Sequence, residues 1–273
     1  MSIDGFGDIA GLVRRRAGIV LTEDKAYLLE TRLGPVLQRF KLGSLGALAA
    51  ELRRGAGEVM ERAVVEAMTT HESSFFRDGK PFDHLMKILP RLVAQAGSAP
   101  VRIWSAACST GQEPYSVAIL ASDVLGPQAA SRVQIVATDV SAEILVRARA
   151  GIFSQFEVQR GLPVRALVKH FRQEGTRWHI GPAIAGMVKF EEHNLLGPRR
   201  NDGGFDVIFC RNVLIYFDAE TKRRVLEFLS AHLRGDGVLY LGGAETVLGI
   251  TDRLVAVAGE RGAYGLAGKR AAA

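Results

Sequence analysis

The feature that most constrains the fold is a change in hydrophobic periodicity near residue 100. Beyond it, short and nearly continuous apolar runs alternate with helical patterns, which is typical of a parallel sheet covered by helices on both faces. The expected strands span residues 101–106, 133–138, 188–191, 205–210 and 237–241. The expected helices span residues 112–125, 142–150 and 219–233. Two short strands, at residues 254–257 and 263–266, are expected to pair antiparallel at the sheet edge.

The first 70 residues carry only helical periodicity. Apolar residues from Leu28 to Phe40 predict a helix that follows an N-cap at Thr22, and Gly34-Pro35 predicts that this helix kinks or splits. No strand is expected before Val101. Further helices are expected at residues 45–53, 58–68 and 82–96.

These patterns divide the chain into a helical domain at residues 1–70, a lid or linker with a helix at 71–97, and an α/β domain at 98–273. Residues 151–187 interrupt the alternation and carry turn signals at Gly161-Leu162-Pro163 and Gly181-Pro182. We interpret this stretch as a small subdomain inserted between two sheet elements.

Composition argues against several classes of protein. The two cysteines, Cys108 and Cys210, lack metal-ligand spacing, so we expect neither a disulfide framework nor a metal site. No stretch reaches the ~20 apolar residues that span a bilayer, and the start lacks a signal peptide's apolar region. A net charge of +6 is too mild to indicate nucleic acid. We expect a cytoplasmic monomer that does not insert into membranes.

Basic residues are concentrated in the helical domain. Residues 11–54 hold nine basic and four acidic side chains, which accounts for most of the net charge. Lys25, Arg32 and Arg39 are spaced seven residues apart, which predicts one shared helix face. An acidic protein surface would complement this face, although a solvated helix surface is the favoured explanation for any single charge.

Candidate ligand-binding residues lie where strands of such sheets end. Small residues and Gly111 follow the first strand, and Glu113 starts the next helix. An acid there suits the ammonium group of a methionine moiety, or it complements the helix dipole. Asp139 ends the second strand, where a carboxylate accepts hydrogen bonds from ribose or caps the next helix. Together with the first-strand loop, Asp139 favours an adenosine site, and the absence of a G-x-G-x-x-G sequence leaves a dinucleotide site weakly supported.

Three later segments extend this site. Asn194 and Leu195 follow the third strand and suit an adenine edge and face. Arg211 and Asn212 follow the fourth strand, with Tyr216 close behind, where an aromatic ring can stabilise a sulfonium by cation–π attraction. The segment Thr69–Asp78 combines polar residues, two phenylalanines and an arginine, and is either a lid over the site or a structural linker.

In combination, these segments resemble the chemotaxis receptor methyltransferases of the CheR family. The strings FFRD at residues 75–78 and CRNVLIYFD at 210–218 are the most specific part, and the resemblance covers most of residues 69–245. It implies an α/β fold: a class I, Rossmann-like S-adenosylmethionine methyltransferase domain with an inserted β-subdomain, preceded by a small all-α domain. Family members methylate receptor glutamates to γ-methyl esters and release S-adenosylhomocysteine.

The resemblance also implies roles for individual residues. It places Arg77 and Tyr216 nearest the transferred methyl group, and it assigns receptor recognition to the helical domain. His71 and Ser73 stand where the family often has Asn and Thr, and both retain hydrogen-bonding capacity. The implied cofactor contacts are His71, Ser73, Arg77, Glu113, Asp139, Asn194, Leu195, Arg211 and Asn212.

Three alternatives remain at this stage. An RNA methyltransferase would use Cys108 or Cys210 as a nucleophile, but the Asn-Pro-Pro-Tyr string of N-methylating enzymes is absent. A non-catalytic signalling module would bind the cofactor without transferring its methyl group. An NAD-dependent oxidoreductase lacks its glycine-rich fingerprint.

Overall fold

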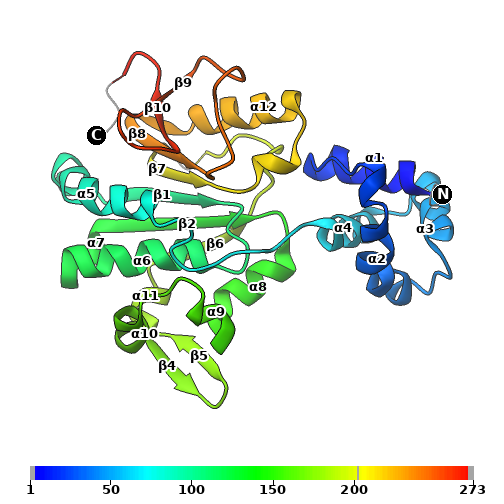
Figure 1. Ribbon diagram of the computed structural model, residues 1–273, viewed down its shortest axis with the longest axis horizontal. Coiled ribbons are helices and arrows are strands. Elements are labelled where there is room, and N and C mark those ends of the chain that lie inside the picture. Colours follow the sequence, from blue (N-terminus) through cyan, green and yellow to red (C-terminus); the bar gives the residue numbers. More distant parts are fainter. Residues whose placement is uncertain (1–3, 202, 270–273) are drawn as a thin grey trace. The chain divides into compact units, whose positions relative to one another are not determined.

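The computed structural model describes residues 4–201 and 203–269 (Figure 1). Residues 1–3 and 270–273, at the outer ends of the first and last expected domains, lie outside the described residues, as does residue 202. Contacts divide the chain into two compact units. One comprises residues 1–70 and 216–222, and the other comprises residues 71–215 and 223–273.

The first unit is a helical bundle around an apolar core. Its helices are α1 (Phe6–Ala17), the 3₁₀ helix η1 (Glu23–Lys25), α2 (Tyr27–Arg39), α3 (Leu45–Arg54) and α4 (Glu58–Met68). Ile9, Leu29, Leu33, Leu48 and Val64 are fully buried in this core, because each lies on the inward face of its helix. Within the described part of residues 1–100 no strand forms, apart from an isolated bridge at Ile19.

The prediction of a kink or split at Gly34-Pro35 is wrong as regards a split. Helix α2 runs unbroken from Tyr27 to Arg39 with Pro35 inside it. The proline costs one backbone hydrogen bond on an exposed side. Leu33 and Val36, on either side of the interruption, both stay buried, so core packing holds the helix together.

The prediction that Lys25, Arg32 and Arg39 share one helix face is also wrong. Lys25 lies in the 3₁₀ helix η1, which Thr22 precedes, and only Arg32 and Arg39 lie on α2. Arg32 is committed to the end of α4, because its Nη1 donates to the carbonyl oxygens of Met68 and Thr69 at 3.1 and 3.2 Å. Lys25 and Arg39 are exposed.

A short segment from late in the chain completes the helical unit. The backbone N–H of Val20 donates to the carbonyl oxygen of Tyr216 at 2.9 Å. Arg14 pairs with Asp218 at 2.6 Å, and Ile19 bridges to Phe217. The helical unit is therefore discontinuous in sequence.

The second unit is built on a seven-stranded sheet with the order β6-β2-β1-β7-β8-β10-β9. The first five of these strands are parallel, and β10 and β9 are antiparallel, as expected for the tail. The strands are β1 (Val101–Ala106), β2 (Val133–Asp139), β6 (Val188–Glu192), β7 (Phe205–Cys210), β8 (Leu233–Leu241), β9 (Leu254–Ala256) and β10 (Ala263–Leu266).

The expected strands and helices are confirmed, and the largest boundary errors concern β8 and α12. Strand β8 begins at Leu233 rather than residue 237, and helix α12 ends at Ser230 rather than residue 233. Leu233 pairs with Phe205, next to a register shift in β7. This pairing places Leu233 in β8, although helical periodicity would assign it to α12. Five helices outside the insertion lie wholly in this unit: α5 (Lys80–Gln95), α6 (Gln112–Leu125), η2 (Gly126–Gln128), α7 (Ala129–Arg132) and α8 (Ala142–Ala150). Two more, η3 (Leu214–Tyr216) and α12 (Ala219–Ser230), share residues with the first unit.

Helices cover both faces of the sheet (Figure 1). Helices α5 and α6 share one core with alternate strand residues such as Ile103 and Phe209. On the opposite face, Phe228 of α12 lies edge-on against Trp104 of β1, with ring centroids 6.1 Å apart. None of the described helices is long and apolar enough to cross a membrane.

The inserted stretch forms a second, antiparallel sheet with the order β3-β5-β4. Phe153 and Phe171 of this sheet pack edge-on against Phe75, with ring centroids 5.0 and 5.6 Å apart. The insertion thus holds the segment that follows residue 70. Its elements are β3 (Ile152–Ser154), α9 (Gln155–Gln159), α10 (Val164–His170), β4 (Phe171–Glu174), β5 (Arg177–Ile180) and α11 (Pro182–Ala185).

A buried histidine makes the stability of the second unit sensitive to pH. His84 of α5 is 2% exposed, and its Nδ1 lies 2.8 Å from the hydroxyl oxygen of Tyr240. Burial lowers the pKa of His84, nearby Lys87 and Arg91 lower this pKa further, and Glu260 opposes them. A histidine with a lowered pKa stabilises the fold above its unfolded pKa of about 6.5, and this stability is lost as the pH falls.

We therefore expect His84→Gln to reduce the loss of stability in acid. Between about pH 7.5 and about pH 5.5, the free energy of unfolding should fall more in the wild type than in the variant. Urea denaturation at both pH values measures this difference. Equal pH dependence of the two proteins would show that His84 is not the group responsible.

Candidate active site

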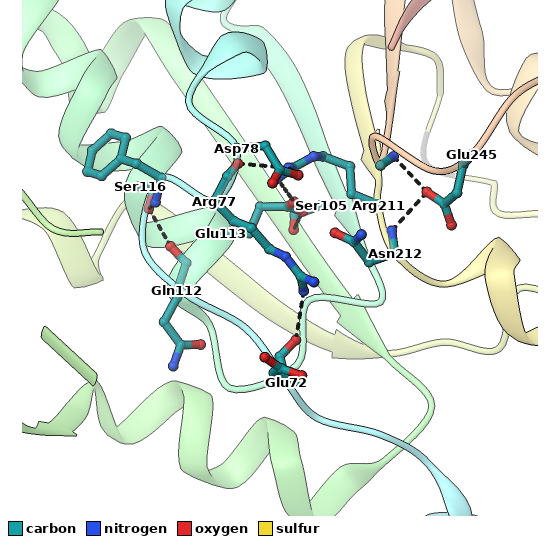
Figure 2. Close-up of polar contacts among 12 residues, drawn as sticks. Glu72, Arg77, Asp78, Ser105, Gln112, Glu113, Ser116, Arg211, Asn212 and Glu245 are labelled. Atoms are coloured by element: carbon teal, nitrogen blue, oxygen red, sulfur yellow. Dashed lines mark hydrogen bonds and ion pairs between the residues drawn. The ribbon is translucent and has the colours of Figure 1, made fainter. Parts of the chain in front are cut away.

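The candidate site lies at the carboxyl ends of the parallel strands. Strand β1 pairs with β2 on one side and with β7 on the other, so the chain order reverses beside β1. Ligands of open α/β sheets bind at such a switch point. The segment at residues 71–79, which we call the lid segment, also reaches this edge, where Arg77 and Asp78 lie beside Arg211 (Figure 2).

A buried guanidinium joins the parts of the site. Arg211, directly after β7, has a side chain that is 2% exposed. Its Nη1 donates to Glu113 at 3.1 Å, and its Nη2 donates to the carboxylate of Asp78 at 2.6 Å (Figure 2). Nη2 also donates to the carbonyl oxygen of Arg77 at 2.7 Å. One side chain therefore connects β7, the start of α6 and the lid segment.

Glu113 is a buried partner in this network. Its second carboxylate oxygen accepts a hydrogen bond from Ser105 at 2.7 Å. Burial raises the pKa of Glu113, and the charge of Arg211 and the hydrogen bond from Ser105 pull this pKa back down. The sequence offered a cofactor ammonium or the helix dipole as partner for this acid, whereas the structure gives it a third partner, Arg211.

The lid segment is held by its backbone. The N–H of Phe76 donates to the hydroxyl of Ser116 at 2.9 Å. Nη1 of Arg77 donates to the carbonyl oxygen of Glu72 at 3.2 Å, which bends this side chain back along its own segment (Figure 2). Together with the packing of Phe75 on the insertion, these contacts make the segment an ordered part of the site rather than a loose linker.

Asp139 organises the loop between β1 and α6. One carboxylate oxygen accepts the backbone N–H of Ser109 at 2.9 Å, and the other accepts that of Ser141 at 3.1 Å. Ser141, not Asp139, caps helix α8, so the helix-cap alternative for Asp139 is wrong. The carboxylate instead ties two of the sheet's terminal loops together.

Backbone strain is concentrated around the site. Six described non-glycine residues have a positive φ, and five of them, all except Lys41, lie in the lid segment or in the loops after β1 and β7. Such conformations cost about 1–3 kcal/mol each and persist where surrounding contacts impose them. The five are Phe76, Asp78, Ala107, Ser109 and Asn212.

Two buried polar atoms suggest that the site receives a polar ligand. The hydroxyl oxygen of Ser109 and Nε of Arg211 have no hydrogen-bond partner in the structure, although both are shielded from solvent. Buried polar atoms are nearly always satisfied, so a missing partner requires an explanation. A polar cofactor such as S-adenosylmethionine, bound across these loops, fits this arrangement.

The remaining predicted site residues lie in three places. His71 and Ser73 are half-buried in the lid segment. After β6, Leu195 is buried, and the side-chain oxygen of Asn194 accepts the backbone N–H of Leu196 at 2.9 Å. Tyr216 groups with the helical unit. The cofactor and catalytic assignments of all these residues stay predictions.

Sequence reasoning missed three residues that shape the site. Asp78 pairs with Arg211, Ser116 holds the lid segment, and Glu245 accepts backbone hydrogen bonds from the loop after β7. The sequence carries a signal for Asp78, because an acid directly after Arg77 at a candidate site is a natural counter-ion for a nearby arginine. Ser116 and Glu245 carry no signal in a single sequence, because each acts on a backbone group more than 30 residues away.

The two cysteines of the chain are poorly suited to act as nucleophiles. Burial raises the pKa of the Cys108 and Cys210 thiols, which disfavours the reactive thiolate that an RNA-modifying nucleophile requires. Among the residues that the structure describes, no three His, Cys, Asp or Glu side chains gather where they would hold a metal ion.

Known proteins resemble both parts of the chain. The family described as "CheR methyltransferase, all-alpha domain" matches residues 4–69, and "CheR methyltransferase, SAM binding domain" matches residues 71–263. Chemotaxis protein methyltransferase 1 of Pseudomonas aeruginosa is 41% identical over 88% of this chain and 89% of its own length. A chemotaxis protein methyltransferase of Salmonella typhimurium is 36% identical over 88% of this chain and 83% of its own length.

The Arg211 network leads to a stability prediction. Arg211→Met removes the cation that compensates the buried Glu113, so we expect a loss of about 3–5 kcal/mol in the free energy of unfolding. Adding Glu113→Gln should restore part of this loss, because the uncompensated charge disappears. Urea denaturation of the wild type, Arg211→Met and the double variant Arg211→Met/Glu113→Gln measures both effects. A loss below about 1 kcal/mol for Arg211→Met would contradict the role given to this pair.

Proposed function

The chain belongs to the CheR methyltransferase family, and from this membership we propose that it methylates glutamate side chains of chemoreceptor cytoplasmic domains. It is an S-adenosylmethionine-dependent methyltransferase of chemotaxis. The proposed products are a glutamate γ-methyl ester and S-adenosylhomocysteine. The structural observation that supports the proposal is the Arg211 network, which fixes the lid segment to the carboxyl ends of the parallel strands.

The proposed cofactor site runs along the carboxyl ends of three strands. Glu113 and Arg211 would hold the amino-acid end, and Asp139 would accept hydrogen bonds from the ribose hydroxyls. Asn194 and Leu195 would contact the adenine edge and face. Asn212 from the β7 loop and His71 and Ser73 from the lid segment complete the proposed contacts.

The proposed chemistry needs no general base. The cofactor supplies a methyl group on a positively charged sulfur, and a glutamate carboxylate is already ionised at neutral pH. The protein's task is to align the carboxylate and exclude water. In the described structure the guanidinium of Arg77 makes one hydrogen bond, to Glu72, which leaves N–H groups to orient an incoming carboxylate oxygen.

A single-oxygen contact from Arg77 would suit this reaction better than a bidentate one. A tight bidentate salt bridge lowers the nucleophilicity of a carboxylate, whereas one hydrogen bond orients it and leaves the second oxygen to attack. Tyr216 is proposed to stabilise the sulfonium through its ring. Both roles come from the family resemblance and rest on the same proposed binding mode.

The helical unit is the proposed receptor-binding part. Lys25 and Arg39 are exposed, while Arg32 is engaged by Met68 and Thr69. The acidic helices of a receptor cytoplasmic domain would therefore meet Lys25 and Arg39 rather than the three-residue face that the sequence predicted. We place this encounter in the cytoplasm, with the enzyme as a monomer and without nucleic acid or membrane insertion.

The first test is methyl transfer from tritiated S-adenosylmethionine to a receptor cytoplasmic fragment. We expect label that base releases as methanol, and no label when the receptor's methylated glutamates are replaced by alanine. Arg77→Ala should lower kcat/KM by roughly 100-fold, with Arg77→Lys intermediate. Cofactor binding without transfer to any receptor fragment would contradict the proposed function and favour the signalling module.

A second test addresses receptor recognition. The double variant Lys25→Glu/Arg39→Glu should raise the KM for the receptor fragment by roughly tenfold at low ionic strength, because both changes repel an acidic partner. High salt should shrink this difference by screening. The double variant Arg253→Glu/Lys269→Glu makes the same charge change at exposed positions of the other unit and serves as control. If the double variant and the control behave alike, Lys25 and Arg39 do not bind the receptor.

A further inference from the structure

A buried carboxylate anchors the loop after β7 from the neighbouring strand. Glu245 follows β8 and is 8% exposed. Its Oε2 accepts the backbone N–H of Asn212 at 2.8 Å and that of Gly242 at 2.6 Å (Figure 2). Its Oε1 accepts the backbone N–H of Leu214 at 2.7 Å. Hydrogen bonds with one ionised partner are roughly twice as strong as neutral ones.

The loop that Glu245 holds has a strained backbone at Asn212, one of the proposed cofactor contacts. Asn212 has a φ of 60°, in the left-handed region. It follows Arg211 directly, and its left-handed conformation sets the direction in which the Asn212 side chain leaves the backbone. The side chain of Asn212 points away from Glu245, toward the side of the site where Arg77 and Glu113 lie (Figure 2).

The turn after β8 is shaped to accept this contact. A Cβ atom on Gly242 would lie 2.7 Å from Oε2 of Glu245 and 2.8 Å from the side-chain nitrogen of Asn212. It would also lie 2.9 Å from the backbone nitrogen of Asn212. Any side chain at position 242 would therefore displace the carboxylate or Asn212. Glycine at this point lets the two strand ends approach closely.

We propose that Glu245 is a positioning residue of the cofactor site. It holds Asn212 in its left-handed conformation and so aims the Asn212 side chain at the bound cofactor. The proposal rests on the proposed function, since it requires that the β7 loop contact S-adenosylmethionine. Glu245 itself acts only on backbone N–H groups of the described residues and would not touch the cofactor.

If Glu245 had only a structural role, its loss would lower stability without changing cofactor affinity. Asp206 provides the matched control for this distinction. Asp206 lies on β7, at the end of the strand opposite to Asn212. Its carboxylate accepts the backbone N–H of Arg102 at 2.7 Å. It also pairs with Arg234 at 2.7 Å. Asp206→Asn therefore neutralises a buried carboxylate that supports β7 without disturbing the carboxyl end of the strand.

The experiment compares the affinity of the variants for S-adenosylhomocysteine by titration calorimetry, well below their unfolding temperatures. Glu245→Gln should weaken binding by about tenfold, because the amide presents donors where the backbone N–H groups need acceptors. Asp206→Asn should bind within about twofold of the wild type, although its Tm falls. Gly242→Ala retains the carboxylate group but displaces it or Asn212, so it should weaken binding in the same direction as Glu245→Gln.

A double-mutant cycle identifies the route of the effect. Asn212→Gly removes the side chain and tolerates a positive φ. If Glu245 acts through Asn212, adding Glu245→Gln to this variant should weaken binding little further. Full additivity, or unchanged affinity in both Glu245→Gln and Gly242→Ala, would overturn the proposal. If the wild type itself failed to bind S-adenosylhomocysteine, the proposed function would fall instead.

Discussion

The guanidinium of Arg211 must satisfy its hydrogen bonds inside the protein, and much of the site is arranged around that requirement. A buried charge is tolerated only when it is paired and hydrogen-bonded. Glu113 and Asp78 supply the charge, and the carbonyl oxygen of Arg77 supplies a further acceptor. Because these partners come from a helix start and from the lid segment, the lid segment cannot leave without exposing or orphaning the guanidinium. Order in the lid segment follows from this electrostatic demand.

A second carboxylate performs the complementary task on the backbone. The guanidinium of Arg211 binds the carboxylates of Glu113 and Asp78, whereas Glu245 binds the backbone N–H groups of Asn212 and Leu214, which follow Arg211 in the chain. Asp139 ties the loop after β1 to the start of α8 in a similar way. In this site, the carboxylates of Glu245 and Asp139 bind backbone N–H groups, and the guanidinium of Arg211 binds the carboxylates of Glu113 and Asp78. This arrangement suits a reaction in which the enzyme aligns two charged groups and transfers no proton.

The fold could be predicted from the sequence because hydrophobic periodicity records burial directly. The strands at residues 101–106 and 205–210 are read from uninterrupted apolar runs, and the structure confirms them. The errors came where tertiary contacts override local signals: core packing carries α2 through Pro35, and pairing with β7 extends β8 back to Leu233. For the site, strand ends pointed to Glu113 and Asp139, but Glu245 acts on amides distant in sequence, which no local pattern reveals.

The segment at residues 216–222 has a consequence for how such proteins can be recombined. It lies late in the chain, yet it bonds to Val20 and Arg14 of the helical unit. A crossover between two homologous genes near codon 70 would exchange the four main helices but leave this segment with the other parent. The backbone pairing at Ile19 and Phe217 would survive such an exchange, whereas the Arg14–Asp218 pair requires both parents to agree. Because Arg14 is largely exposed, losing this pair in a chimaera should cost only about 0–1 kcal/mol of stability.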